Sequence, residues 1–215
     1  MKKNMRYFFY MFTRGLLYLF SLIWFRISIK GKENLPGYGG YIFASNHTSH
    51  LDPVFCGLAN PWPLYYLAKK ELFKIPVFGT LIHIYYSIPI DRAKGDIRAI
   101  KIAIDLLMSG KPVLMFPEGT RSEDGHIKEA KRGVGFIVDK AGVPVVPCYI
   151  DGAMKALRKN SKVIYPVKIR VLVGRPLFFQ DILSDDMKKE DRQTKISQSI
   201  IRAIRELKDQ LEEKS

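Results

Sequence analysis

The stretch that decides the fold is residues 41–59, which read YIFASNHTSHLDPVFCGLA. Its first five residues are apolar or small and predict a buried strand. Asp52-Pro53 predicts the start of a helix that runs to residue 58 or 59, because proline suits a first helical turn. His47 lies in the polar turn between these two elements, five positions before Asp52. A strand that leads through a polar turn into a helix is the basic unit of an α/β layer fold.

The rest of the chain repeats this alternation of short apolar runs and helix-like segments. Further strands are expected at residues 64–68, 84–90, 113–116, 143–150 and 164–173, and further helices at residues 77–82, 97–108 and 133–141. From residue 185 onward a charged segment carries an apolar stripe that favours a helix packed on the domain: Ile196, Ile200, Ile204, Leu207 and Leu211. The pattern predicts an α/β fold with a mostly parallel central sheet flanked by helices, in a catalytic domain of residues 31–215.

Residues 1–30 predict an amphipathic helix that associates with a membrane. Residues 7–25 are almost wholly apolar and aromatic, interrupted by Arg14 and bounded by Arg6 and Arg26. The uninterrupted apolar run is eleven residues long, whereas a helical span needs about 20. In the membrane interface the three arginines would reach lipid phosphates while the aromatic side chains enter the acyl layer. We therefore favour a monotopic helix over a spanning helix or a buried helix of a soluble protein.

The charge of the chain indicates anionic partners. Its 35 lysine and arginine residues against 21 aspartate and glutamate residues give a formal net charge of +14. Lipid headgroups, phosphorylated substrates and nucleic acid all fit this charge. Nucleic acid is the weakest of the three, because the basic residues are dispersed and no recognition motif accompanies them. Cys56 and Cys148 lie in apolar surroundings without metal-type spacing and are expected to be reduced core thiols.

Residues that suit acid–base chemistry or anion binding follow three of the predicted strands. His47 and Asp52 follow the first, Arg92 follows the strand at 84–90, and the run PEGTRS at 117–122 follows the strand at 113–116. The carboxyl ends of parallel strands meet at one edge of a sheet, so we expect these side chains to share a cleft.

The residue types indicate acyl transfer onto a phosphorylated alcohol. His47 would be the general base, with Asp52 orienting its imidazole. Backbone N–H groups around Gly119 and Thr120 would stabilise an oxyanion. A phosphate would be bound by the cations Arg92, Arg121, Lys131 and Arg132, since guanidinium groups suit bidentate contact.

Each motif also has a simpler explanation. His47 and Asp52 at this spacing would often only stabilise a turn, and Glu118 with Arg121 would form a local ion pair. A metal site of His47, His50 and Asp52 is disfavoured by the spacing and by the lack of an evident further ligand. We therefore expect no metal and no cofactor.

Four segments, in order, resemble the motifs of the glycerolipid acyltransferase family, specifically its bacterial 1-acyl-sn-glycerol-3-phosphate acyltransferases. They are NHTSHLD at 46–52, IPIDR at 88–92, FPEGTRS at 116–122 and VPVVP at 143–147. The second segment departs from the family pattern, with Tyr86 where glycine is frequent and Pro89 at an aromatic position.

The resemblance implies roles for the residues in these segments. His47 and Asp52 of the H-x4-D motif would form the catalytic dyad, and Arg92 would contact the acceptor phosphate. Glu118 and Arg121 would belong to the acceptor site, and the segment at 143–147 would be an apolar strand near the acyl region.

The resemblance also implies a monotopic membrane enzyme that needs no metal. It would transfer a fatty acyl group from acyl-CoA or acyl carrier protein to the 2-hydroxyl of 1-acyl-sn-glycerol 3-phosphate (lysophosphatidic acid), giving phosphatidic acid. The location of thioester donors and the basic flanks of the first helix favour the cytoplasmic face of an anionic membrane. The open alternatives are another acceptor, namely a different lysophospholipid, glycerol phosphate or an aminoacyl lipid, and a non-catalytic module that binds anionic lipid.

Overall fold

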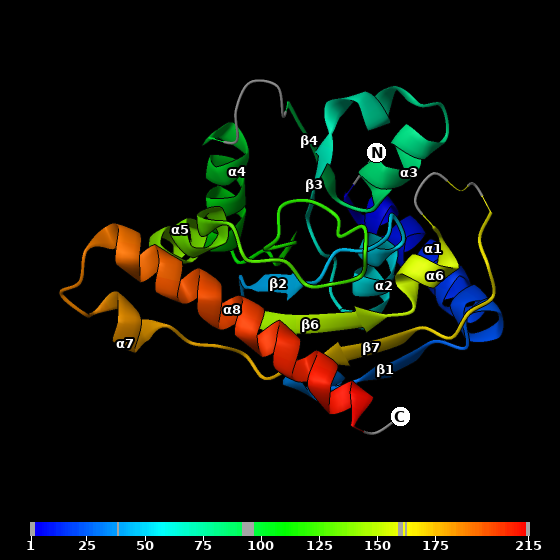
Figure 1. The fold of residues 1–215 in the computed structure, drawn as a ribbon. Helices are drawn as coiled ribbons and strands as arrows, with labels where there is room; N and C mark the ends of the chain where they lie inside the picture. Colours follow the sequence, from blue (N-terminus) through cyan, green and yellow to red (C-terminus); the bar gives the residue numbers. More distant parts are fainter. Residues whose placement is uncertain (1–2, 38, 92–96, 159–160, 162, 214–215) are drawn as a thin grey trace.

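A computed structural model describes residues 3–37, 39–91, 97–158, 161 and 163–213 (Figure 1). Its centre is a five-stranded sheet with the order β1-β7-β6-β2-β5. The strands are β1 (Ser28–Lys30), β2 (Ile42–Ser45), β5 (Val113–Met115), β6 (Val145–Asp151) and β7 (Arg170–Val173). Neighbouring strands pair in parallel, except that β6 and β7 are antiparallel. The predicted α/β fold with a mostly parallel sheet is confirmed.

A two-stranded parallel sheet continues this arrangement beyond β5. It consists of β3 (Tyr66–Lys69) and β4 (Ser87–Ile90). A parallel bridge between Tyr65 and Val113 connects it to β5. The carboxyl ends of β2, β5 and β6 therefore share one edge with those of β3 and β4, and functional residues of such folds gather at that edge.

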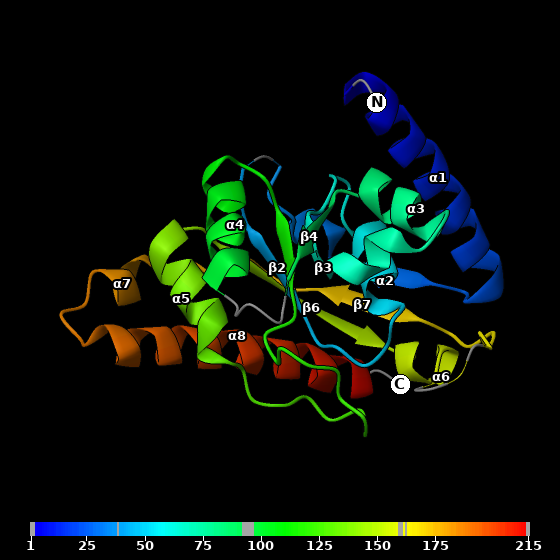
Figure 2. The ribbon, with the colours of Figure 1, turned by 90° about the horizontal axis from the view of Figure 1, so that it is seen from above.

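Helices cover both faces of the sheet, as Figures 1 and 2 show. Phe43 of β2 packs in a core with α1 (Lys3–Trp24), α2 (Asp52–Ala59) and α6 (Ala153–Ala156). Its neighbours Ile42 and Ala44 pack in a second core with α4 (Ile97–Met108), α5 (Arg132–Ala141) and α8 (Lys189–Glu212). This alternation is the period of two that a strand imposes on its side chains. The remaining helices are η1 (Lys32–Asn34), η2 (Lys70–Lys74), α3 (Phe78–Ile84) and α7 (Gln180–Leu183).

Two predicted strands are wrong in their bounds. The segment at 164–173 becomes a strand only at Arg170, because Pro166 has no N–H for a strand ladder. The segment at 84–90 begins with the last residue of α3, and its strand starts only at Ser87. Between the two, Tyr86 turns the chain with a φ of 57°.

The C-terminal helix and the cysteines agree with the sequence analysis. The predicted apolar stripe of α8 is buried in the core that also contains α5 and β6. Cys56 and Cys148 are free and buried.

Helix α1 has an unusual distribution of polarity. It is long and apolar enough to cross a membrane, judged by length and composition alone. The exposed side is apolar and aromatic: Met5, Tyr7, Phe8, Phe9, Met11, Phe12, Leu16, Leu19, Phe20, Leu22, Ile23 and Trp24. Its polar residues Thr13, Arg14 and Ser21 face the protein instead. The surface helix of a soluble protein has the reverse arrangement, so this face is typical of a contact surface for lipid or for another protein.

The predicted contact of Arg14 with lipid phosphates is wrong. The guanidinium donates hydrogen bonds to the carbonyls of Gly57, Leu58 and Asn60, at distances of 3.2, 3.1 and 2.9 Å. These carbonyls lie at the C-terminus of α2, where unpaired C=O groups and the helix dipole attract a cation. Arg14 therefore fastens α1 to α2. The sheet itself starts within the first 30 residues, with β1, and the division into residues 1–30 and 31–215 stays a prediction.

Candidate active site

Asn46 fixes the position from which the candidate site is built. It directly follows β2 and is 2 % exposed. Its Nδ2 donates to the Ile150 carbonyl at 3.0 Å, and its Oδ1 accepts from the Ile150 N–H at 2.8 Å. The side chain continues the pairing with β6 after the β2 ladder has ended, which leaves no buried polar group of Ile150 unpaired. Asn46 belongs to the motif at 46–52, but its role cannot be predicted from the sequence, because its partner Ile150 lies on the neighbouring strand.

His47 and Asp52 form the predicted pair. His47 Nδ1 lies 2.8 Å from Asp52 Oδ2, and the Asp52 side chain is fully buried. The same oxygen accepts the N–H groups of Thr48 and Ser49, each at 2.7 Å. The other oxygen, Oδ1, has no hydrogen-bond partner among the described residues. An ionised carboxylate only accepts hydrogen bonds, so Nδ1 carries the proton and Nε2 has the lone pair of a base.

Phe116 holds the imidazole from one face. The two rings are stacked with centroids 3.8 Å apart and an interplanar angle of 12°. Phe116 follows β5, the strand beside β2, so sheet topology brings the two rings together. The His47 side chain keeps 18 % of its surface exposed. The sequence analysis did not identify this contact, since an aromatic residue at a strand end is ordinarily part of the core.

Glu118 connects the loop after β5 to the backbone of His47. Its Oε1 accepts the His47 N–H at 2.9 Å, and its Oε2 accepts the Lys128 N–H at 3.0 Å. In return the His47 carbonyl accepts the Ser122 N–H at 2.7 Å. Burial raises the pKa of Glu118, although the Lys128 and His47 N–H groups oppose that rise. The carboxylate therefore organises the loop, and its contact with an acceptor stays a prediction.

A hollow of about 230 Å³ lies next to the segment that carries the dyad. It is lined by Thr48, Thr120, Arg121, Ser122 and Glu123. Thr48 directly follows His47, so the hollow reaches this segment, although the imidazole itself does not line it. Partial desolvation lowers the pKa of His50, and the charges of Arg121 and His47 lower it further. Arg121 therefore lies close enough to His50 for its charge to act on that imidazole.

Gly119 and Lys131 shape the loop between Glu118 and Arg121. Gly119 has a φ of 71°, which glycine adopts without strain. A Cβ atom added there would lie 2.7 Å from Lys131 Cδ and 3.2 Å from Lys131 Nζ. The Gly119 N–H donates to the Phe116 carbonyl, so it is not free for an oxyanion. In the described part of the chain the Thr120 N–H has no such partner.

The predicted site residues thus converge, with one outside the described part. His47, Asp52, Glu118, Gly119, Thr120, Arg121 and Lys131 lie around the ends of β2 and β5. Arg92 lies outside the described residues. Its neighbour Asp91 follows β4 at the same sheet edge and pairs with Lys70. The catalytic and binding roles of the predicted site residues stay predictions.

Two further expectations concern metal ions and the segment at 143–147. Among the described residues, no group of three or more His, Cys, Asp or Glu side chains could hold a metal ion. Val145 and Val146 are fully buried and pair with Ile42 and Phe43 at the start of β2. They support the sheet, and their proximity to an acyl chain stays a prediction.

Comparison with known proteins identifies the relatives of the chain. A family model described as Acyltransferase matches residues 26–151, which include the dyad and the loop after β5. The 1-acyl-sn-glycerol-3-phosphate acyltransferase of Bacillus subtilis is 30% identical over 87% of this chain and 90% of its own length. The Streptococcus pneumoniae protein of the same name is 32% identical over 81% of this chain and 64% of its own length.

A plant relative and a solved structure extend the comparison. The chloroplastic 1-acyl-sn-glycerol-3-phosphate acyltransferase BAT2 of Brassica napus is 31% identical over 77% of this chain, which spans only 50% of that protein. The crystal structure of the 1-acyl-sn-glycerophosphate acyltransferase PlsC from Thermotoga maritima matches with a TM-score of 0.69 and 30% identity. That match covers 85% of this chain and 72% of the other.

Proposed function

The chain belongs to the acyltransferase family, and from that premise we propose that it acylates 1-acyl-sn-glycerol 3-phosphate. The donor is an acyl thioester, either acyl-CoA or acyl carrier protein, and the product is phosphatidic acid. The observation that carries the proposal is the dyad geometry. His47 Nδ1 is held 2.8 Å from a fully buried Asp52, and the next residue, Thr48, lines a hollow together with Arg121. A base with a fixed tautomer next to a cation suits an acceptor that carries both a hydroxyl and a phosphate.

In the proposed reaction His47 Nε2 removes the proton from the 2-hydroxyl as that oxygen attacks the thioester carbonyl. Asp52 stabilises the imidazolium that forms. The Thr120 N–H is the backbone donor for the tetrahedral oxyanion. The intermediate collapses when the carbon–sulfur bond breaks, and His47 returns the proton to the departing thiolate. No metal or cofactor takes part in these steps.

The phosphate of the acceptor is bound by cations beside the hollow. Arg121 lines the hollow, and the Lys131 side chain extends along Gly119, two residues before Arg121 in the same loop. Arg92 is proposed as a further cation on the strength of the family resemblance. Glu118 serves the site through the loop, since it holds the His47 N–H. The enzyme is proposed to act as a monotopic protein on the cytoplasmic face of an anionic membrane, through the apolar face of α1.

A panel of acceptors with one acyl-CoA donor tests the proposal. The protein should release free thiol with 1-acyl-sn-glycerol 3-phosphate and much less with a lysophospholipid that carries a headgroup, with glycerol phosphate or with an aminoacyl lipid. The His47→Ala variant should bind the membrane and release no thiol. Arg121→Ala should mainly raise KM for the phosphorylated acceptor. Lipid binding without thiol release by the wild-type protein would instead identify a non-catalytic lipid-binding module.

A further inference from the structure

The segment that joins η2 to α3 exposes a second apolar surface. Its exposed side chains form what we call the apolar tip: Ile75, Val77, Phe78 and Leu81, with exposed fractions of 47%, 83%, 42% and 38%. None of these residues takes part in the proposed chemistry. Exposed apolar side chains that cluster in this way mark a contact surface.

The backbone of the apolar tip is strained in a way that directs Val77 outward. Val77 has a φ of 63° and a ψ of −54°, although β-branched residues rarely adopt positive φ. The tight turn is closed by a hydrogen bond of 2.6 Å from the Phe78 N–H to the Pro76 carbonyl. A strained residue whose side chain is not packed inside the protein indicates a role in binding and not in folding.

The segment that directly follows the apolar tip is fastened to the part of α1 nearest the N-terminus. Arg6 donates to the His83 carbonyl at 2.6 Å, and its guanidinium lies 4.0 Å from the centroid of the Tyr86 ring. The Tyr85 hydroxyl donates to Thr13 Oγ1 at 3.1 Å, and Tyr10 packs edge-on against the Tyr85 ring. Figures 1 and 2 both show α3 beside α1. The exposed apolar side chains of the tip and of α1 thus lie on neighbouring elements that are held together.

The residues before the apolar tip supply positive charge. Lys69, directly before η2, and Lys74, its last residue, are exposed. Basic side chains beside exposed apolar ones fit a surface of anionic lipid headgroups over acyl chains. The continuity with α1 favours the same occupant, a lipid bilayer.

We propose that the apolar tip, residues 75–81, is a second membrane-insertion element that enters the bilayer together with α1. The proposal rests on the membrane association in the proposed function and extends it to a segment beyond the N-terminal helix. Two separated contacts fix the orientation of a protein on a bilayer, whereas a single helix leaves rotation about its axis free. The tip therefore determines how the carboxyl edge of the sheet faces the lipid.

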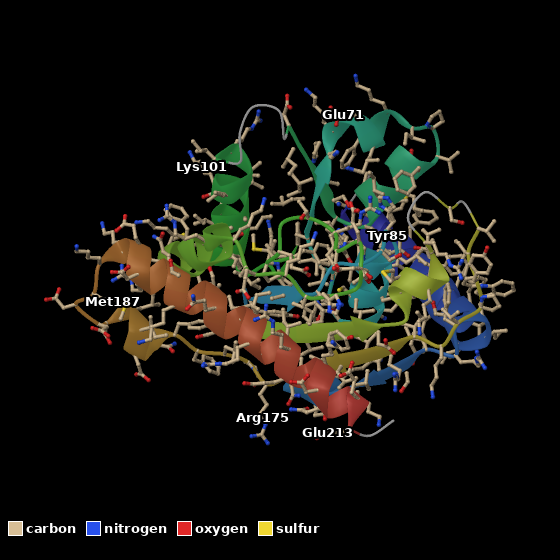
Figure 3. The ribbon with its side chains drawn as sticks, viewed as in Figure 1. Glu71, Tyr85, Lys101, Arg175, Met187 and Glu213 are labelled. Carbon is tan, nitrogen blue, oxygen red and sulfur yellow. The ribbon has the colours of Figure 1, made fainter. Side chains whose placement is uncertain are left out.

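Flotation with vesicles of phosphatidylglycerol and phosphatidylcholine tests this role. Val77→Asp and Ile75→Asp should each weaken vesicle binding by about tenfold, because each replaces a buried apolar contact with a charge. Thiol release in detergent micelles should stay at the wild-type level. Phe178→Asp is the matched control, since Phe178 is 65% exposed and its neighbour Arg175 lies on the opposite side of the molecule from Glu71 of η2 (Figure 3).

A fluorescence measurement tests insertion directly. An environment-sensitive dye on Val77→Cys should shift to the blue on addition of vesicles, whereas the same dye on Phe178→Cys should not. The two native cysteines are buried and do not compete for the label. Equal shifts at both positions, or unchanged vesicle binding in both aspartate variants, would overturn the proposal. If the wild-type protein itself fails to float, membrane association as a whole is refuted, and thiol release still tests the chemistry separately.

Discussion

Asp52 Oδ2 lies within hydrogen-bond distance of three donors, namely His47 Nδ1 and the N–H groups of Thr48 and Ser49. The two backbone donors fix the carboxylate before any substrate arrives, so the carboxylate fixes the imidazole in turn. The Phe116 ring prevents the imidazole from tilting toward one side. At the scale of the residue, the reactivity of His47 is therefore set by its neighbours.

The Asp52→Asn variant tests this dependence. An asparagine side chain whose oxygen keeps the N–H groups of Thr48 and Ser49 would still orient Nδ1, but it has no negative charge to stabilise the imidazolium that forms. We expect kcat to fall by roughly 10³–10⁴-fold, with KM for both substrates little changed. Thiol release measured over a range of substrate concentrations separates the two constants. Asp105→Asn, on the exposed side of α4, is the control, and an equal loss there would contradict the prediction.

Glu118 predicts a specific dependence of stability on pH. Burial raises the pKa of the Glu118 carboxyl above its ordinary value, so the folded protein binds this proton more tightly than the unfolded chain does. The contribution to stability is present below about pH 4.5 and is lost as the pH rises through the raised value. The free energy of unfolding of the wild type should therefore fall more steeply with pH in that window than that of Glu118→Gln. Urea denaturation at a series of pH values measures both slopes, and parallel curves would refute the raised pKa.

At the scale of the element, helix α2 connects the active site to α1. Its first residue is Asp52, and the carbonyls at its other end accept the three hydrogen bonds from Arg14. The charge that interrupts the apolar run of α1 is thus used inside the protein, where it complements the negative end of the α2 dipole. The same helix has the carboxylate of the proposed dyad at one end and the contacts to α1 at the other.

Removing this cation should loosen the attachment of α1. Arg14→Ala leaves the C-terminal carbonyls of α2 without their charged donor and should lower the free energy of unfolding by about 1.5–3 kcal/mol. Chemical denaturation in detergent measures the loss. Arg175→Ala removes an exposed arginine and should change stability by less than about 0.5 kcal/mol. Equal changes in the free energy of unfolding of the two variants would show that the Arg14 hydrogen bonds do not stabilise the protein.

A substitution in the turn before α3 should instead raise the free energy of unfolding. Glycine adopts the positive φ of Val77 without a steric penalty, and the 83% exposed valine side chain loses little packing when it is removed. Val77→Gly should therefore raise the free energy of unfolding by about 1 kcal/mol. The same variant should bind vesicles more weakly. Higher stability together with weaker vesicle binding would show that the strained turn costs stability and that the valine side chain contributes to membrane binding. A lower free energy of unfolding would contradict the presence of strain at Val77.

At the scale of the whole molecule, charge and apolar surface act together. The net charge of +14 attracts an anionic membrane from a distance, and salt screens that attraction. The apolar surface of α1 and the tip acts only on contact and is insensitive to moderate salt. Binding to anionic vesicles should therefore fall by about tenfold between 0.1 and 0.5 M sodium chloride. Sedimentation with neutral vesicles is the control and should show no such dependence.

The sequence determined much of this protein by itself. The strand that leads to His47, the helix that starts at Asp52 and the apolar stripe of α8 are local patterns, because periodicity and turn chemistry are properties of neighbouring residues. The order of four motif segments also carried the family resemblance. The sequence also showed that Tyr86 stands where the family frequently has glycine, but it did not show what this residue contacts. Tyr86 keeps the positive φ that favours glycine, and its ring contacts Arg6 of α1.

The tertiary structure alone decided the contacts between distant segments. The Phe116 ring on His47, the Glu118 carboxylate on the His47 N–H and the Asn46 amide on Ile150 all join residues of neighbouring strands. Arg14 could be read from the sequence only as a charge in an apolar run, and its partners on α2 became known through the fold. The physical reason is that a side chain's role depends on what surrounds it in space. Spacing along the chain specifies elements, whereas the pairing of β2 with β5 and β6 specifies which residues meet.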